Sequence, residues 1–185
     1  MKKLIFIAFL FMLGVTVANA QGVRFGAKAG VNFSGANGDD VPDVSSRTGL
    51  NIGAVVNFEL SELFAIQPEV TYSMRGFKDG DFEIKVDYVD IPIMADVTIA
   101  EGLSLQGGPI IGVNVTATAE DTSSGIEGDI EDISTLNIGA GIGAQYELPM
   151  GLFFNLRYDM GFNDIIDNDF DAKNCNLALS AGFFF

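Results

Sequence analysis

The sequence predicts an all-β protein: an eight-stranded, antiparallel, up-and-down transmembrane β-barrel of an outer membrane. Apolar side chains alternate with small or polar ones in about eight runs between Val23 and Phe185, and this period of two is typical of β-strands. Most runs exceed the roughly five or six residues of a strand in a soluble sheet and match the about 9–11 tilted residues that cross a bilayer. Short and long connections alternate, as in outer-membrane barrels.

The first 20 residues have the features of a cleaved secretory signal peptide. Lys2 and Lys3 precede an apolar stretch, and Ala18-Asn19-Ala20 forms a small-residue cleavage site. The apolar stretch is shorter than the roughly 20 residues of a membrane-spanning helix, so we favour cleavage over an N-terminal anchor. We therefore expect a signal peptide at 1–20 and an outer-membrane barrel domain at 21–185.

The first strand after this segment shows the alternation most clearly, with Val23, Phe25 and Ala27 on one face and Arg24, Gly26 and Lys28 on the other. Continuing along the chain, we expect strands at 23–34, 48–60, 64–75, 84–99, 103–117, 135–147, 151–162 and 174–185. The short connections are 61–63, 100–102 and 148–150, and the long ones are 35–47, 76–83, 118–134 and 163–173. An even number of strands places both termini on one side, which we expect to be periplasmic, with the long loops extracellular.

Two strands indicate which face points inward. The polar face of the run 135–147 carries mainly small side chains: Asn137, Gly139, Gly141, Gly143 and Gln145. One face of 151–162 carries large side chains: Leu152, Phe154, Leu156, Tyr158, Met160 and Phe162. A narrow lumen needs small residues, whereas a water-exposed surface would carry many Lys and Glu residues. We therefore expect the apolar face to contact lipid, and a soluble lipocalin-type barrel with reversed faces is the alternative.

Three prolines conflict with simple strand chemistry. Pro68, Pro92 and Pro109 lie inside the third, fourth and fifth expected strands, where proline removes a backbone donor. We expect a local bulge near each. The apolar period of the fourth strand changes phase around Tyr88, which supports this expectation.

The composition excludes several kinds of chemistry. The chain contains no histidine, which removes Ser-His-Asp hydrolysis and histidine metal sites. Without residues 1–20, eight basic residues remain against 25 acidic ones, so we expect no nucleic-acid binding. Cys175 is the only cysteine and forms no internal disulfide. We expect neither enzymatic activity nor a cofactor.

The polar face nevertheless carries charges of both signs. These are Arg24, Lys28, Arg75 and Arg157 against Glu59, Glu69, Asp90, Asp96, Glu147 and Asp159. Lys28, Glu69, Asp90 and Arg157 are expected near the middle of the barrel as a lumen charge network. An ion-selective pathway is one interpretation. We favour a salt-bridged polar core, because eight strands leave little room beyond side chains.

Most of the remaining acidic residues fall in the long connections. Alternating Asp167, Asp169 and Asp171 are weak candidates for a calcium site, because the glycine and closing glutamate of an EF-hand loop are missing. A solvated acidic surface, bridged by divalent cations to lipid head groups, is the simpler interpretation.

Four segments resemble the PorT-like outer-membrane β-barrel domains typical of Bacteroidetes: QPEVTYSMRG (67–76), YVDIPIMADV (88–97), GGPIIGVNV (107–115) and RYDMGFNDIID…NLALSAGFFF (157–185). We expect a monomeric barrel that contacts outer-membrane lipid. Its last strand, which ends on Phe185, resembles that of other outer-membrane barrels, and this resemblance implies that the barrel-assembly machinery recognises the strand and inserts the protein. We expect a structural or interaction role in the envelope, and the resemblance to PorT-like relatives implies an envelope or secretion protein as partner. The alternative is a barrel that binds or transports a ligand or ion through its acidic loops or lumen.

Overall fold

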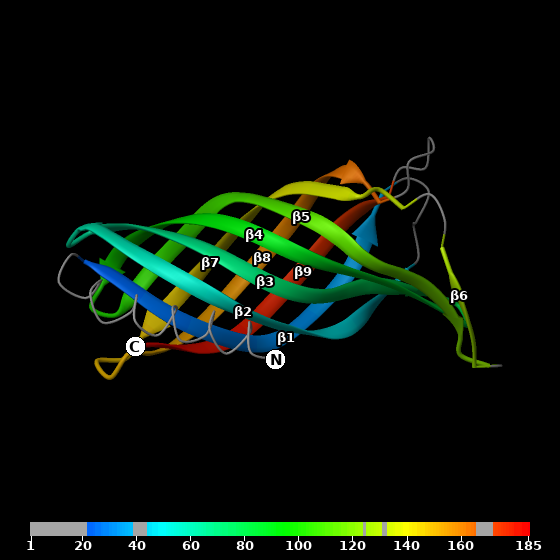
Figure 1. Cartoon of the computed structure of the whole chain (residues 1–185), viewed down its shortest axis with the longest axis horizontal. Helices are drawn as coiled ribbons and strands as arrows, with labels where there is room; N and C mark the ends of the chain where they lie inside the picture. The colour runs from blue at the N-terminus through cyan, green and yellow to red at the C-terminus, as the bar shows by residue number, and fades with distance from the viewer. Residues whose placement is uncertain (1–21, 39–43, 124, 131–132, 166–171) are drawn as a thin grey trace, which may run out of the picture.

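In the computed structural model, the chain forms one elongated barrel (Figure 1). The structure describes residues 22–38, 44–123, 125–130, 133–165 and 172–185. The expected signal peptide lies outside these residues.

The described residues contain nine strands, eight of which form the barrel. They are β1 (Val23–Asn37), β2 (Ser45–Ser61), β3 (Phe64–Asp79), β4 (Phe82–Ala100), β5 (Leu103–Asp121), β6 (Ile126–Asp129), β7 (Leu136–Glu147), β8 (Leu152–Asp164) and β9 (Lys173–Phe184). Sequential barrel strands pair antiparallel, and β1 also pairs with β9, which closes the ring. The predicted fold class is confirmed.

The two ends of the barrel differ. Short connections join β2 to β3, β4 to β5 and β7 to β8, and we call this the turn end; the opposite end is the loop end. The C-terminus lies at the turn end (Figure 1).

The strands extend further at the loop end than the sequence pattern predicts. The expected loop 76–83 is instead a tight hairpin: β3 and β4 stay paired up to Asp79 and Phe82, and Gly80 takes a positive φ of 57° in the turn. Part of the expected loop 118–134 is also ordered, because β6 pairs with Thr118–Asp121 of β5. We call the paired ends of β3, β4, β5 and β6 the projecting hairpins, which extend beyond the barrel at the right of Figure 1.

No bulge is found at Pro68 or Pro109, whereas the irregularity that the phase change around Tyr88 indicated in the fourth strand is present at Asp87/Tyr88. Pairing keeps one register through Pro68 and Pro92, and it is identical on both sides of Pro109 (Pro92↔Ile110 and Ala95↔Gly107). Each proline lacks a backbone N–H and so removes a hydrogen bond from the ladder, but no extra residue is inserted into the strand. The paired residues on either side of the proline keep the register. The β4–β5 pairing has two register shifts, one at Asp87/Tyr88, where the apolar period changes phase, and one between Thr98 and Ala100.

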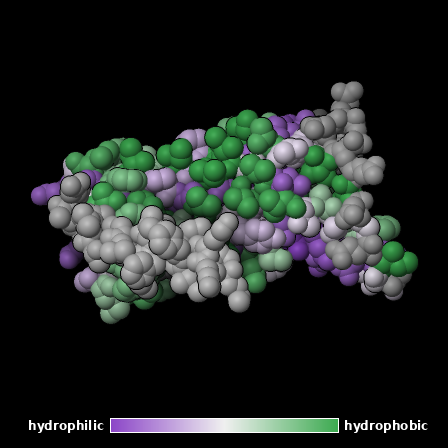
Figure 2. All heavy atoms as spheres, in the orientation of Figure 1, coloured by the Kyte–Doolittle hydropathy of each residue, from purple (hydrophilic) through white to green (hydrophobic). Residues whose placement is uncertain are grey.

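The outer wall of the barrel is apolar. Large side chains such as Ile52, Val70, Ile142 and Leu156 are about half exposed, and apolar residues gather over the visible wall (Figure 2). The inward positions between them are buried and largely polar, such as Asn51, Thr71 and Asn155. No helix in the described parts of the chain has the length and apolarity needed to cross a membrane.

Candidate functional site

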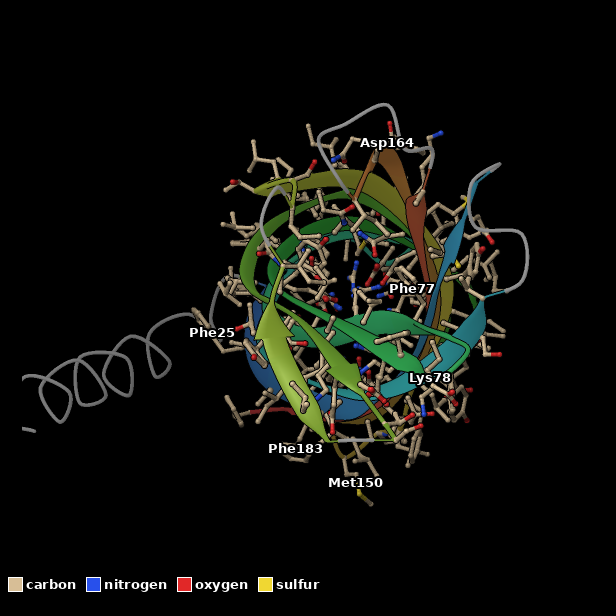
Figure 3. All side chains as sticks on the ribbon, turned by 90° about the vertical axis from the view of Figure 1, so that its right-hand side faces the viewer. Phe25, Phe77, Lys78, Met150, Asp164 and Phe183 are labelled. Carbon is tan, nitrogen blue, oxygen red and sulfur yellow. The ribbon has the colours of Figure 1, made fainter. Side chains whose placement is uncertain are left out.

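The lumen holds a chain of buried ion pairs near its middle. Lys28 Nζ lies 2.5 Å from Glu69 Oε2, and Arg157 Nη1 lies 2.9 Å from the same oxygen. All three side chains are almost completely buried. They come from β1, β3 and β8, so the contacts cross the lumen from one part of the wall to another, and oxygen and nitrogen atoms fill the centre of the end view (Figure 3).

Three further ion pairs extend this chain. Arg157 Nε lies 3.0 Å from Asp159, Arg75 Nη2 lies 3.6 Å from Asp159, and Arg75 Nη2 lies 2.5 Å from Asp90. We call these six residues (Lys28, Glu69, Arg75, Asp90, Arg157 and Asp159) the central ion-pair network. Three cations face three carboxylates, so the buried charges balance.

The four residues expected near mid-barrel thus belong to one network but do not all touch. Lys28, Glu69 and Arg157 are in direct contact, whereas Asp90 joins them only through Arg75 and Asp159. Their function in the protein stays a prediction.

Apolar side chains occupy the lumen on both sides of this network. The turn-end cluster consists of Val55, Phe153 and Phe184, with the two rings 4.7 Å apart. Gly182 makes room for it, because a Cβ there would lie 2.2 Å from Phe153 Cζ. The loop-end cluster, in which Phe77 lies inside the ring of strands (Figure 3), consists of Ala36, Phe77, Val86, Tyr88, Ile165 and Ala172.

Arg47 is a lumen residue that the sequence analysis missed. The β2–β3 register shifts between Ser46 and Asn51, and the Arg47 guanidinium donates to the backbone carbonyl of Arg75 within this interval. It also lies 2.9 Å from Glu83 and 3.6 Å from Asp87. The expected start of this strand at residue 48 left Arg47 in a loop. Extending the period of two from Asn51 through Gly49 would have placed it on the inner face.

Side chains of β1 form hydrogen bonds with the backbone of β3 in the same interval. Asn32 Nδ2 donates to the Met74 carbonyl at 3.1 Å. Ser34 Oγ both donates to the Gly76 carbonyl and accepts from the Gly76 N–H, each at 2.9 Å. These bonds replace ladder bonds that the shifted register removes, as buried backbone groups require.

The turn end is open to a cavity of about 1000 Å³, which we call the turn-end vestibule. Its lining includes Arg24, Asn57, Asp96 and Gln145, with Glu62 and Glu101 on the adjoining turns. Arg24 spans the mouth from β1 to β7: it forms ion pairs with Glu59 and Glu147, and its guanidinium lies 4.5 Å from the centre of the Phe184 ring.

The projecting hairpins are acidic, and their cations are paired. Lys78 lies 3.3 Å from Glu83, and Lys85 lies 2.5 Å from Glu120. The hydrogen bond from Arg47 holds the pKa of the Glu83 carboxyl below its usual value. The calcium candidates Asp167, Asp169 and Asp171 lie outside the described residues. Among the residues that are described, no cluster of three or more Cys, Asp or Glu side chains could hold a metal ion.

Solved structures share this architecture. Ail of Yersinia pestis, in complex with the heparin analogue sucrose octasulfate, is 19% identical, covers 88% of this chain and 99% of its own, and has a TM-score of 0.57. Neisserial surface protein A is 12% identical, covers 87% of this chain and 97% of its own, and has a TM-score of 0.61. A major outer membrane protein of Thermus thermophilus is 15% identical, covers 88% of this chain and 99% of its own, and has a TM-score of 0.51. At these identities, the likeness shows the fold alone.

The closed ring of eight strands, its apolar outer wall and these neighbours define a small outer-membrane β-barrel protein. Residues 19–167 match the family model described as outer membrane protein beta-barrel domain, and the chain belongs to this family. No curated protein matches the chain significantly.

Proposed function

We propose that this protein is a non-conducting barrel with a structural or interaction role in the envelope. The observation that carries this proposal is the filled lumen: the central ion-pair network lies between two apolar clusters. An eight-stranded ring leaves little space beyond its own side chains. In this proposal, the surfaces at the turn end and the loop end carry the function.

The same proposal includes orientation and partners. Both termini and the turn end face the periplasm, and the loop end with its projecting hairpins faces outward, as in other outer-membrane barrels. The barrel is a monomer in contact with outer-membrane lipid, and the barrel-assembly machinery inserts it. The PorT-like segments and the absence of histidine from the sequence favour a non-enzymatic role, with a protein secretion machine as the assembly in which a partner would be found.

Ligand or ion binding at the acidic loop end is the second candidate function. Carboxylates there outnumber the cations, and Lys78, Lys85 and Lys173 each lie within 3.7 Å of one of them. This arrangement favours cations over polyanions, so we expect no binding of the sulfated sugar that was crystallised with Ail.

Conductance separates a filled barrel from a pore. We expect purified protein in planar lipid bilayers to give no stable unitary currents, because ion pairs and apolar clusters occupy the lumen. Heat-modifiable migration of the same preparation on gels serves as the control that the barrel has folded. Stable, reproducible unitary currents from folded protein would defeat the proposal and favour the ion pathway.

A further inference from the structure

One buried carboxylate in the lumen lacks a counter-ion. Five carboxylates are buried among the described residues: Glu69, Asp87, Asp90, Asp96 and Asp159. Four of them lie 2.5–3.6 Å from a lysine or arginine nitrogen. Asp96 forms no ion pair with any described residue, although its side chain is as deeply placed as theirs, with 4% exposure.

The Asp96 carboxylate is also incompletely hydrogen-bonded. Its Oδ1 is buried without a hydrogen-bond partner. Ala65 of β3 and Gln106 of β5 lie opposite it in the register; the Gln106 side chain hydrogen-bonds the carboxyl, but neither residue carries a positive charge. Burying a charged group without a partner costs several kcal/mol, so such groups are normally paired. A buried carboxyl without a counter-ion is stabilised by a bound proton or by a cation, so Asp96 can accept a cation from outside the chain.

The position of Asp96 offers a route for such a cation. Asp96 lines the turn-end vestibule, whose other carboxylates are Glu59, Glu62, Glu101 and Glu147. Among the described residues of this lining, Arg24 is the one lysine or arginine, and Glu59 and Glu147 already engage it. The mouth is therefore net negative, and a concave acidic mouth concentrates cations.

The shape and chemistry of the vestibule favour an organic cation over a metal ion. A metal ion needs several converging ligands, and the described residues contain no such cluster. The cavity of about 1000 Å³ is far larger than one ion, and Ala65 and Pro149 contribute apolar lining that suits an alkyl chain.

We propose that the turn-end vestibule binds a primary ammonium or guanidinium group, with Asp96 as its counter-ion. Asn57 and Gln145 line the same cavity, but Arg24 donates to Asn57 Oδ1 and Gln67 and Gln106 donate to Gln145 Oε1, so Asp96 is the acceptor that carries the proposal. The group is carried either by a free polyamine or by a lysine or arginine of a partner protein. This proposal does not depend on the role assigned to the loop end.

Calorimetric titration of the folded protein in detergent at low ionic strength tests this proposal. The probes are spermidine and trilysine amide, with MgCl₂ and succinate as controls. We expect at least one ammonium probe to bind, and neither control. Binding of trilysine amide alone identifies a protein segment as the source, and binding of spermidine alone identifies a free polyamine.

A pair of variants locates the site. Asp96→Asn removes the charge and keeps the shape, and we expect it to weaken binding about tenfold or more, equivalent to ~1.4 kcal/mol. Asp81→Asn is the matched control, because Asp81 is exposed on the turn between β3 and β4, at the other end of the molecule. We expect it to leave affinity unchanged. Heat-modifiable migration verifies that both variants fold.

Three results would overturn the proposal: absence of binding by the wild type, equal affinity of Asp96→Asn and the wild type, or stronger binding of Mg²⁺ than of either ammonium probe. If the Asp96→Asn variant does not assemble, a measurement on the wild-type protein alone tests the proposal. The ¹³C carboxyl resonance of Asp96 is then expected to shift on addition of the ammonium probe that binds. An unmoved resonance at saturation rejects the site.

Discussion

Replacing Glu69 by leucine is expected to lower the free energy of unfolding by about 3–5 kcal/mol, the usual cost of removing one partner from a buried ion pair. Glu69 Oε2 accepts from both Lys28 and Arg157, and all three side chains are almost fully buried. The substitution leaves Lys28 without a carboxylate and Arg157 with Asp159 only. Because the chain has no tryptophan, denaturant unfolding in phospholipid vesicles is best followed by circular dichroism.

The matched control removes both charges together. In Lys28→Met/Glu69→Leu, Arg157 keeps Asp159 as its partner and no buried cation is left unpaired. We expect this double variant to be more stable than Glu69→Leu alone, since an uncompensated charge costs more than a missing pair. A Glu69→Leu protein within about 0.5 kcal/mol of wild type, the range of an unremarkable surface change, would contradict the account of the network.

Leu156→Arg is the second change with a large expected effect. Leu156 lies on the outer face of β8, 49% exposed, between Ala144 of β7 and Leu179 of β9. An arginine on the lipid face costs about 2–4 kcal/mol at the bilayer midplane and about 0–1 near the interface. We expect the variant to assemble poorly in vivo and to lose most of its heat-modifiable form in the outer-membrane fraction.

Two comparison variants separate lipid exposure from other effects of arginine. Met150→Arg places the same charge on the turn between β7 and β8, where Met150 is exposed, and we expect normal assembly. Asn155→Arg introduces it on the inner face next to Leu156, and we expect less damage than from Leu156→Arg. Equal assembly of Leu156→Arg and Asn155→Arg argues against the assigned orientation of the faces.

Sequence reasoning predicted the barrel because its main determinant is local. The period of two is visible within each strand, and it places Lys28, Glu69 and Arg157 on the inner face without knowledge of pairing partners. The ends of the strands were harder to predict from the sequence, because Gly80 in the expected loop 76–83 is equally compatible with a long loop and a tight hairpin. The register of the opposite strand decides between these outcomes, and sequence alone does not contain it.

The contacts inside the lumen form only when the strands close into a ring, so the sequence pattern alone does not reveal them. Arg24 meets Glu147, 123 positions away, because ring closure brings β7 across the mouth from β1. Asp96 illustrates the same limit: its inward direction follows from alternation, but its lack of a counter-ion follows only from where every cation lies. Arg47 was missed for a different reason, since its strand starts earlier than its apolar residues indicate.

Lipid contact of individual methyl groups is the most direct test of the central claim that the apolar face is outside and the polar face inside. In methyl-labelled wild-type protein in lipid nanodiscs, we expect nuclear Overhauser effects between lipid acyl chains and the methyls of Leu156 and Leu179, which are 49% and 50% exposed. We expect none to Val55 and Ile110, which are 1% and 2% exposed within the lumen. Acyl-chain contacts at Val55 and Ile110, with water contacts at Leu156 and Leu179, would contradict the account.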